Sequence, residues 1–186
     1  MSPRVHDPLY FDPNAKPVHD PSTLDVRATH IPIPRDGLTG ELGVGGSYTM
    51  LGKPLDDDDL RGSWLVDCAG ELPADYLARA SGSIMRVFAD IDSVPSTYGR
   101  IELLAQQLAS KLRGDGDDGA PPEDALPDGT PERIYVLCKQ GLNRSALLAG
   151  RVLRLLDVPA EQTVELLRTH RPGALSNQAF VELIHS

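Results

Sequence analysis

The residues best placed for chemistry form one short stretch in the second half of the chain, Ile134-Tyr-Val-Leu-Cys138-Lys-Gln-Gly141-Leu-Asn-Arg144-Ser145. An apolar run leads into a loop that contains a glycine, and a helical pattern follows at once. At such a strand-to-helix crossing, loop N–H groups and the positive end of the helix dipole attract an anion and favour the thiolate form of a cysteine. Arg144 adds a planar guanidinium that fits two phosphate oxygens. We therefore predict a phosphate-binding loop with Cys138 as its nucleophile.

Three apolar runs and three amphipathic patterns predict the elements that position this loop. The runs 64–68, 84–88 and 134–138 predict buried strands, whereas the patterns 96–113, 143–156 and 159–170 predict helices. Ser96 is the expected N-cap of the first helix, and Gly114 is its expected stop. Strands that alternate with helices favour a sheet that is mainly parallel. We expect a compact three-layer α/β domain over 26–186, in which helices flank a central sheet of about four to five strands.

The other segments carry signals for turns and solvated surface. Residues 1–25 contain five prolines and predict an extended arm. The segment 26–33 predicts a weak edge strand, because Pro32 and Pro34 cannot serve in a central one. Glycines make 37–52 turn-prone, and seven acidic residues, four glycines and four prolines predict a flexible acidic loop over 114–133. We interpret the aspartate run 56–59 as a solvated loop or helix start rather than a metal site.

Length, charge and cysteine content exclude several classes of protein. The 186 residues fit one domain, and two cysteines cannot form a disulfide framework. The net charge of −9 argues against nucleic acid as a partner and against stable association with an anionic membrane. Residues 134–186 carry six basic and four acidic side chains, a net of +2, which leaves −11 in 1–133. No stretch has the apolar length of a signal peptide or membrane span, and we expect a cytoplasmic protein without metal or cofactor.

The loop resembles that of the cysteine-dependent protein tyrosine phosphatase superfamily, C-x5-R-[ST], and more closely that of its dual-specificity branch, C-x-x-G-x-x-R-[ST]. The likeness spans about 64–184. It implies that Cys138 takes the phosphoryl group from a phosphorylated protein or a small phosphomonoester, and that Ser145 eases release of the thiolate. It also implies that Asn177, in a late stretch similar to that branch, orders the site. The groups implied to bind phosphate are Arg144 and the loop amides of Lys139, Gln140, Gly141, Leu142, Asn143 and Arg144.

Phosphoryl transfer to a cysteine also needs a general acid that protonates the leaving oxygen. The stretch Phe88-Ala-Asp90-Ile-Asp92-Ser-Val-Pro95 follows a predicted strand and resembles the acid loop of this superfamily. Asp90 is favoured, because a Phe-x-Asp step followed by a proline matches the lipid-phosphatase relatives best. Asp92 remains the alternative, and both residues could instead cap the turn or the next helix.

Two positions leave alternatives open. Leu137 stands where the superfamily usually has a histidine before the nucleophile, so a catalytically weak or inactive phosphate-binding module is a second hypothesis. Lys139 is similar to a residue of phosphoinositide phosphatases, but these usually carry a second basic residue where this chain has Leu142. A rhodanese-like sulfurtransferase or an arsenate reductase is a third hypothesis, since neither needs the upstream aspartate.

The second cysteine, Cys68, ends the first predicted strand. The ends of parallel strands gather at one edge of a sheet, so Cys68 is expected near Cys138. In some phosphatases of the superfamily a cysteine at a similar place protects the oxidised nucleophile through a disulfide. Cys68 is therefore a redox candidate, with plain core packing as the alternative reading.

Overall fold

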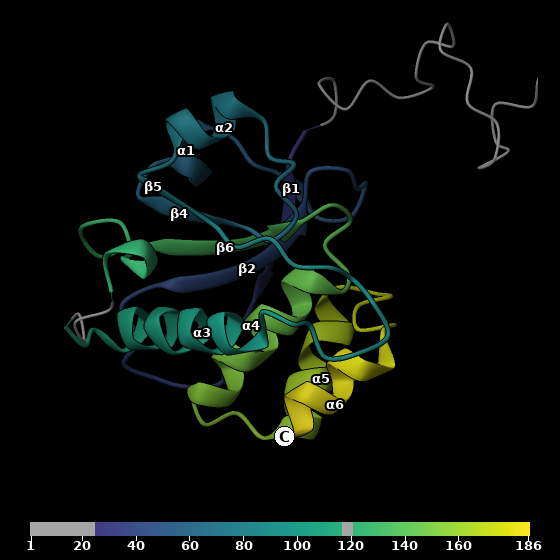
Figure 1. Ribbon diagram of the computed structural model, residues 1–186. Coiled ribbons are helices and arrows are strands. Elements are labelled where there is room, and N and C mark those ends of the chain that lie inside the picture. Colours follow the sequence, from purple (N-terminus) through teal and green to yellow (C-terminus); the bar gives the residue numbers. More distant parts are fainter. Residues whose placement is uncertain (1–24, 117–120) are drawn as a thin grey trace, which may run out of the picture.

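The computed structural model describes residues 25–116 and 121–186. Apart from Asp25, the arm predicted over 1–25 lies outside the described residues, as do residues 117–120 of the predicted acidic loop. The fold within the described residues is a single sheet with helices on both faces (Figure 1).

Six strands form the sheet in the order β3-β1-β2-β6-β4-β5. Strands β2, β6, β4 and β5 run parallel, whereas β1 is antiparallel to both β2 and β3. The prediction of a mainly parallel sheet is confirmed, with one strand more than the expected four to five. The strands are β1 (Arg27–Ile31), β2 (Glu41–Gly46), β3 (Lys53–Pro54), β4 (Ser63–Asp67), β5 (Gly82–Met85) and β6 (Arg133–Cys138).

The helices divide unevenly between the two faces of the sheet. Figure 1 shows the short helices α1 and α2 above the sheet and the longer α3, α4, α5 and α6 below it, which gives the three predicted layers. The helices are α1 (Asp57–Leu60), α2 (Ala74–Arg79), α3 (Tyr98–Arg113), α4 (Arg144–Leu155), α5 (Ala160–His170) and α6 (Gln178–His185), with a 3-10 turn at Pro122–Asp124.

Side-chain alternation along β6 separates two hydrophobic cores. Ile134, Val136 and Cys138 belong to the larger core beneath the sheet, whereas Tyr135 and Leu137 belong to the smaller core on the α1 and α2 side. Each fully buried aliphatic side chain stabilises the fold by about 1.5–3 kcal/mol. Because successive strand residues face opposite sides, Cys138 points toward the layer in which α4 begins.

The glycine-rich segment 37–52 was predicted as turns, and this prediction is wrong for its central part. Residues 41–46 form β2, which lies directly beside β6. A Cβ atom at Gly45 would collide with the Arg27 carbonyl of β1, and one at Gly46 with the Lys139 carbonyl of the predicted phosphate loop. These glycines therefore permit close backbone approach inside a sheet rather than a change of chain direction.

The segment 26–33, predicted as an edge strand, contains β1, which pairs with β2 on one side and with the two-residue edge strand β3 on the other. Other predicted elements agree with the structure except at their ends. The helix predicted over 96–113 begins at Tyr98, with Thr97 rather than Ser96 at its N-cap, and it ends at Gly114 with a φ of 77°. The strand predicted over 84–88 lies instead at Gly82–Met85. Within the predicted acidic loop, Asp124 is buried and pairs with Arg86 and Arg100 at 2.9 and 2.7 Å, so this part of the segment is anchored.

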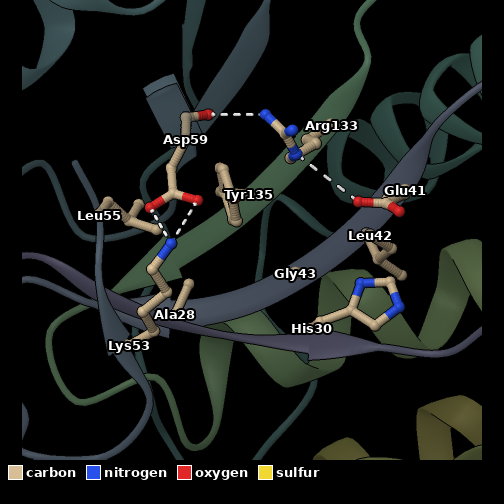
Figure 2. A pocket seen from close by; sticks show the side chains of 10 residues that line it. All are labelled: Ala28, His30, Glu41, Leu42, Gly43, Lys53, Leu55, Asp59, Arg133 and Tyr135. Atoms are coloured by element: carbon tan, nitrogen blue, oxygen red, sulfur yellow. Dashed lines mark hydrogen bonds and ion pairs between the residues drawn. The ribbon is translucent and has the colours of Figure 1, made fainter. Parts of the chain in front are cut away.

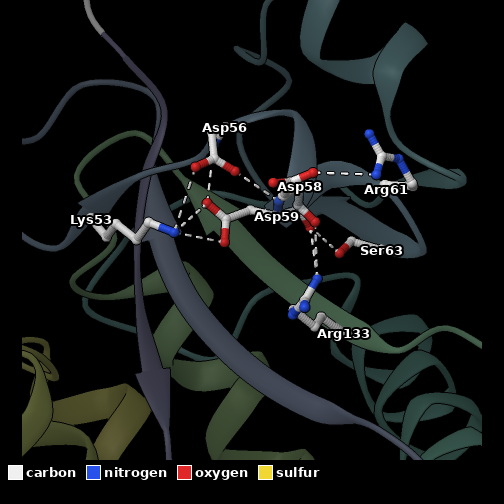
Figure 3. Close-up of polar contacts among 7 residues, drawn as sticks. All are labelled: Lys53, Asp56, Asp58, Asp59, Arg61, Ser63 and Arg133. Carbon is white, nitrogen blue, oxygen red and sulfur yellow. Dashed lines mark hydrogen bonds and ion pairs between the residues drawn. The ribbon is translucent and has the colours of Figure 1, made fainter.

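The aspartate run forms the start of a helix, one of its two predicted readings. The N–H of Asp59 donates to the Asp56 carboxylate at 2.9 Å, and the N–H of Asp56 donates back to the Asp59 carboxylate at 3.1 Å (Figure 3). This reciprocal capping box satisfies two N–H groups at the beginning of α1. Lys53 also reaches Asp59 at 2.9 Å, so the run holds α1 against the edge strand β3.

Candidate active site

Cys138 is the last residue of β6, and α4 begins six residues later at Arg144. The Cys138 side chain is buried, and its Sγ accepts a hydrogen bond from the Gly141 N–H at 3.2 Å. The Ser145 hydroxyl oxygen, in the first turn of α4, lies 3.3 Å from the same sulfur. A thiolate at this place would therefore be stabilised by an amide, a hydroxyl and the N-terminus of a helix.

The loop after Cys138 turns its carbonyl oxygens outward. The Ser47 and Tyr48 N–H groups, which continue β2, donate to the carbonyls of Cys138 and Lys139 at 3.0 and 2.7 Å. Arg171 then donates to the next two carbonyls, those of Gln140 at 2.9 Å and Gly141 at 2.5 Å. The Leu142 carbonyl accepts from the Leu175 N–H at 2.8 Å.

Five consecutive peptide groups are thus held by their oxygen atoms. In a trans peptide the C=O and N–H bonds point in opposite directions. The N–H groups of Lys139, Gln140, Gly141, Leu142 and Asn143 therefore point away from these outer partners, and the Gly141 N–H points at the Sγ of Cys138. Successive N–H groups that face inward are typical of anion-binding concavities.

Gly141 is the position of the loop where glycine is required. Its φ is 70°, a conformation that costs other residues free energy, and a Cβ there would lie 2.5 Å from both the Gly45 carbonyl carbon and the Arg171 guanidinium. The positive φ and these two close approaches explain the glycine in this loop.

Arg144 and the segment after β5 close the site from the other side. The Arg144 guanidinium lies 3.5 Å from the Phe88 carbonyl, so the arginine spans from the phosphate loop to the predicted acid loop. The Phe88 ring is buried, and its centroid lies 6.2 Å from that of the Phe180 ring on α6. This contact anchors the beginning of the acid loop to the core. The predicted acid loop is thereby fixed next to the Cys138 loop, although its tip is exposed.

Asp90 is the acid-loop carboxylate that bonds to residues of the site. One of its oxygens accepts from the Asn143 side-chain amide at 3.0 Å, and the other accepts from the Asn177 amide at 2.8 Å. Asn177 also donates to the Ile91 carbonyl at 2.9 Å. Asp92 lies exposed on the same loop. The contacts therefore distinguish the two predicted acids: Asp90 bonds to Asn143 of the Cys138 loop and to Asn177, and Asn177 bridges Asp90 and Ile91.

Two side chains of the site were not predicted. Only the backbone N–H of Asn143 was expected to contribute to the site. Its side-chain oxygen Oδ1 accepts from Ser176 Oγ at 3.2 Å and from the Asn177 N–H at 3.1 Å, while its side-chain amide donates to Asp90. Arg171 belongs to the late stretch that resembles the dual-specificity branch, yet nothing local in the sequence indicated its contact with the loop.

Cys68 directly follows β4 and is fully buried beside the loop strand. Its N–H donates to the Leu137 carbonyl at 2.7 Å, and both cysteines are free thiols. Burial raises the pKa of the Cys68 thiol, and negative charge on Cys138 raises this pKa further. The two thiols thus lie close enough to influence each other electrostatically, at the sheet edge where the sequence predicted them.

A separate cavity of about 250 Å³ lies on the other face of the sheet, on the side of α1 (Figure 2). Its floor includes Gly43 and the Tyr135 ring, and its two cations are already paired, Lys53 with Asp59 and Arg133 with Glu41. Both cations are therefore compensated by carboxylates that line the same cavity.

Three solved structures place the fold among phosphatases. A kinase associated phosphatase (KAP) with its catalytic-site cysteine substituted by serine matches at a TM-score of 0.54 and 16% identity, covering 88% of this chain and 94% of that one. A putative protein tyrosine phosphatase from Leishmania major matches at 0.52 and 20% identity, covering 88% and 98%. PTPMT1 in complex with PI(5)P matches at 0.50 and 15% identity, covering 77% and 87%.

Neither a protein-family model nor a curated protein matches the sequence at a significant level. Within the described ranges, no helix has the length and apolar character needed to cross a membrane. The structural matches agree with the resemblance that the Cys138 loop predicted. The chain has the fold of the protein tyrosine and dual-specificity phosphatases.

Proposed function

We propose that this protein is a cysteine-based phosphatase that hydrolyses phosphomonoesters through a phosphocysteine intermediate. The observation that carries the proposal is the Cys138 loop, in which five successive carbonyls are bonded on the outside while the Gly141 N–H donates to the Sγ of Cys138. This loop could hold three phosphoryl oxygens with the phosphorus directly above the sulfur, and Arg144 at its rim could bind two of those oxygens.

The proposed reaction has two steps. The Cys138 thiolate attacks phosphorus, the S–P bond forms, and the ester O–P bond breaks while Asp90 gives its proton to the leaving oxygen. Asp90 then takes a proton from water as the water oxygen attacks phosphorus. The S–P bond breaks, and Ser145 stabilises the departing thiolate through the hydroxyl that lies 3.3 Å from it.

For the substrate we favour a phosphorylated protein, carrying phosphotyrosine, phosphoserine or phosphothreonine. Exposed large apolar side chains lie on the loops that follow β2 and β5, at the same sheet edge as Cys138: Met50, Leu51, Val87, Ile91 and Val94. In the loop itself, Lys139 is the exposed cation. Apolar side chains suit a polypeptide better than a highly charged inositol phosphate. The fold shared with PTPMT1 keeps a phosphoinositide phosphatase as the second candidate.

The charge distribution sets the wider context of the proposal. A net charge of −9 disfavours nucleic acid and anionic membranes as partners, and we propose a cytoplasmic location. The anion-binding loop lies in the part of the chain that is weakly basic, so a single phosphate can bind although the protein as a whole is acidic.

Phosphate release from p-nitrophenyl phosphate tests the proposal. The wild type should release phosphate, Cys138→Ser should be slower by about 10³-fold or more, and Cys68→Ser, the matched control at the other cysteine, should keep most of the activity. Equal rates for the wild type and Cys138→Ser, or no release by the wild type, would refute it. Retention of a phosphopeptide without turnover would favour the inactive binding module. An Asp90→Asn variant that is unaffected with phenyl phosphate, whose leaving group needs protonation, would favour a sulfurtransferase or arsenate reductase.

A further inference from the structure

Arg171 is a fully buried cation that no carboxylate accompanies in the described part of the chain. Beyond the two loop carbonyls, its guanidinium donates to Thr29 Oγ1 at 3.0 Å, to Thr49 Oγ1 at 3.4 Å and to the Leu51 carbonyl at 3.4 Å. All of these acceptors are neutral. A buried charge without a counter-ion costs free energy of folding, and an anion nearby would reduce this cost.

Negative charge at Cys138 would compensate the charge of Arg171. Burial lowers the pKa of the Arg171 guanidinium, whereas negative charge on Cys138 acts in the opposite direction. A bound phosphoryl group would add further negative charge at the same place.

The hydrogen bonds of Arg171 also determine the direction of the loop amides. One guanidinium nitrogen binds the Gln140 carbonyl, and the N–H at the other end of that peptide is the one that Gly141 donates to the Sγ of Cys138. A second nitrogen binds the Gly141 carbonyl and so orients the Leu142 N–H. The planar fork of an arginine can hold two successive peptides in this way, which the single ammonium of a lysine cannot.

We propose that Arg171 is a positioning residue of the site, which shapes the phosphate-binding loop and, through the Gly141 N–H that it orients, supports a thiolate at Cys138. Leu137 is fully buried on the opposite face of β6 and brings no polar group to the loop. The inference rests on the proposed phosphate-binding role of the loop, but it can be measured without any turnover.

Several charged or titratable groups surround Cys138 and would contribute to its pH dependence. They are Arg171 after α5, Arg144 at the start of α4, Lys139 in the loop, Asp90 on the acid loop, Cys68 after β4, and Asp67 and Arg86 next to Cys68. Removing Arg171 leaves the others in place, so a change in pH dependence can be assigned to this residue.

The test follows alkylation of Cys138 by iodoacetamide as a function of pH, with mass spectrometry to separate it from the buried Cys68. Arg171→Met, which keeps length and removes charge, should move the midpoint of the alkylation rate to higher pH. Inorganic phosphate should protect the wild type from alkylation and protect Arg171→Met at least tenfold less well.

Arg168→Met is the matched control. Arg168 lies one helical turn earlier and donates to the Ala174 and Leu175 carbonyls, outside the loop. It should lower the melting temperature without changing the alkylation midpoint. If Arg171→Met behaves like Arg168→Met, with an unchanged midpoint and unchanged phosphate protection, Arg171 is merely structural and the proposal fails.

Arg171→Lys keeps the proposal testable if Arg171→Met does not fold. Lysine retains the charge but cannot hold two carbonyls, so the alkylation midpoint should stay near that of the wild type while phosphate protection weakens severalfold. Full protection of Arg171→Lys by phosphate would overturn the proposed shaping of the loop. Because these readouts need no turnover, an inactive wild type would refute the proposed phosphatase activity and leave this inference open to its own test.

Discussion

Removal of the Asn143 side chain should weaken catalysis most for substrates with poor leaving groups. In the structure this side chain binds Asp90, Ser176 and Asn177, and so ties the acid loop to the phosphate loop. Asn143→Ala leaves the backbone N–H of the loop in place and deletes the bond to the Asp90 carboxylate. The proposed acid would then lose one of the two amides that hold its carboxylate in place.

The expected size of the effect follows from the bonds that are lost. A hydrogen bond to a charged group contributes about 1.5–3 kcal/mol, and the lower end applies because Asp90 is exposed. A loss of about 1.4 kcal/mol corresponds to a tenfold change in rate. We expect kcat/KM for phenyl phosphate to fall about tenfold. The fall for p-nitrophenyl phosphate should stay below about threefold, since its leaving group needs little protonation.

The assay compares both substrates in four variants. Ser176→Ala is the control, because it removes one bond to Asn143 at 3.2 Å without touching Asp90. Asp90→Asn supplies the rate without the acid, and the double variant with Asn143→Ala completes a thermodynamic cycle. If Asn143 acts through Asp90, it should have no further effect on phenyl phosphate in the Asp90→Asn background. An equal loss for both substrates, or a full tenfold loss in that background, would refute this reasoning.

Three further results are expected. After treatment with mild peroxide, the Cys138 thiolate should become a sulfenic acid, which the Cys68 thiol converts to a disulfide with loss of water. Mass spectrometry should then find a cross-linked peptide. A sulfonic acid at Cys138 beside a reduced Cys68 would contradict this prediction. Gly141→Ala should strain the loop by about 1–3 kcal/mol and abolish phosphate protection in a protein that still melts cooperatively, as a thermal scan with and without phosphate would show. The hydrogen bond from Arg100 holds the pKa of Asp124 below its usual range. The stabilising contribution of Asp124 is therefore present above about pH 4 and is lost as the pH falls further. Asp124→Asn should lower the melting temperature at pH 7 but hardly at pH 2, and an equal deficit at both pH values would count against the ion pair.

The loop and its flanking elements could be predicted because their signals are local. An apolar run, a loop glycine and an amphipathic helix follow one another within 134–156, and the residues that surround the Sγ of Cys138, Gly141 and Ser145, belong to this stretch. The end of α3 at Gly114 is similarly local, because a left-handed C-cap depends on one residue. Such features need no knowledge of the tertiary fold.

Contacts between distant segments explain what the sequence did not reveal. Asn143 and Asp90 are 53 residues apart, and Arg171 and Gly141 are 30 apart, so no periodic pattern links them. The strand β2 was missed for a related reason. Its glycines are required because β1 and the Cys138 loop approach its backbone, and this approach exists only in the folded sheet.

The alternation along β6 gives a physical reason for leucine at position 137. This side chain lies in the small apolar core with Leu60, Leu65 and Tyr76, where it helps to seat α1 and α2 on the sheet. A histidine buried there without a hydrogen-bond partner would cost about 1–3 kcal/mol. A leucine removes this cost but leaves the loop without a polar support from that face. The support then has to come from outside the strand, and Arg171, with bonds to two successive loop carbonyls, is positioned to provide it.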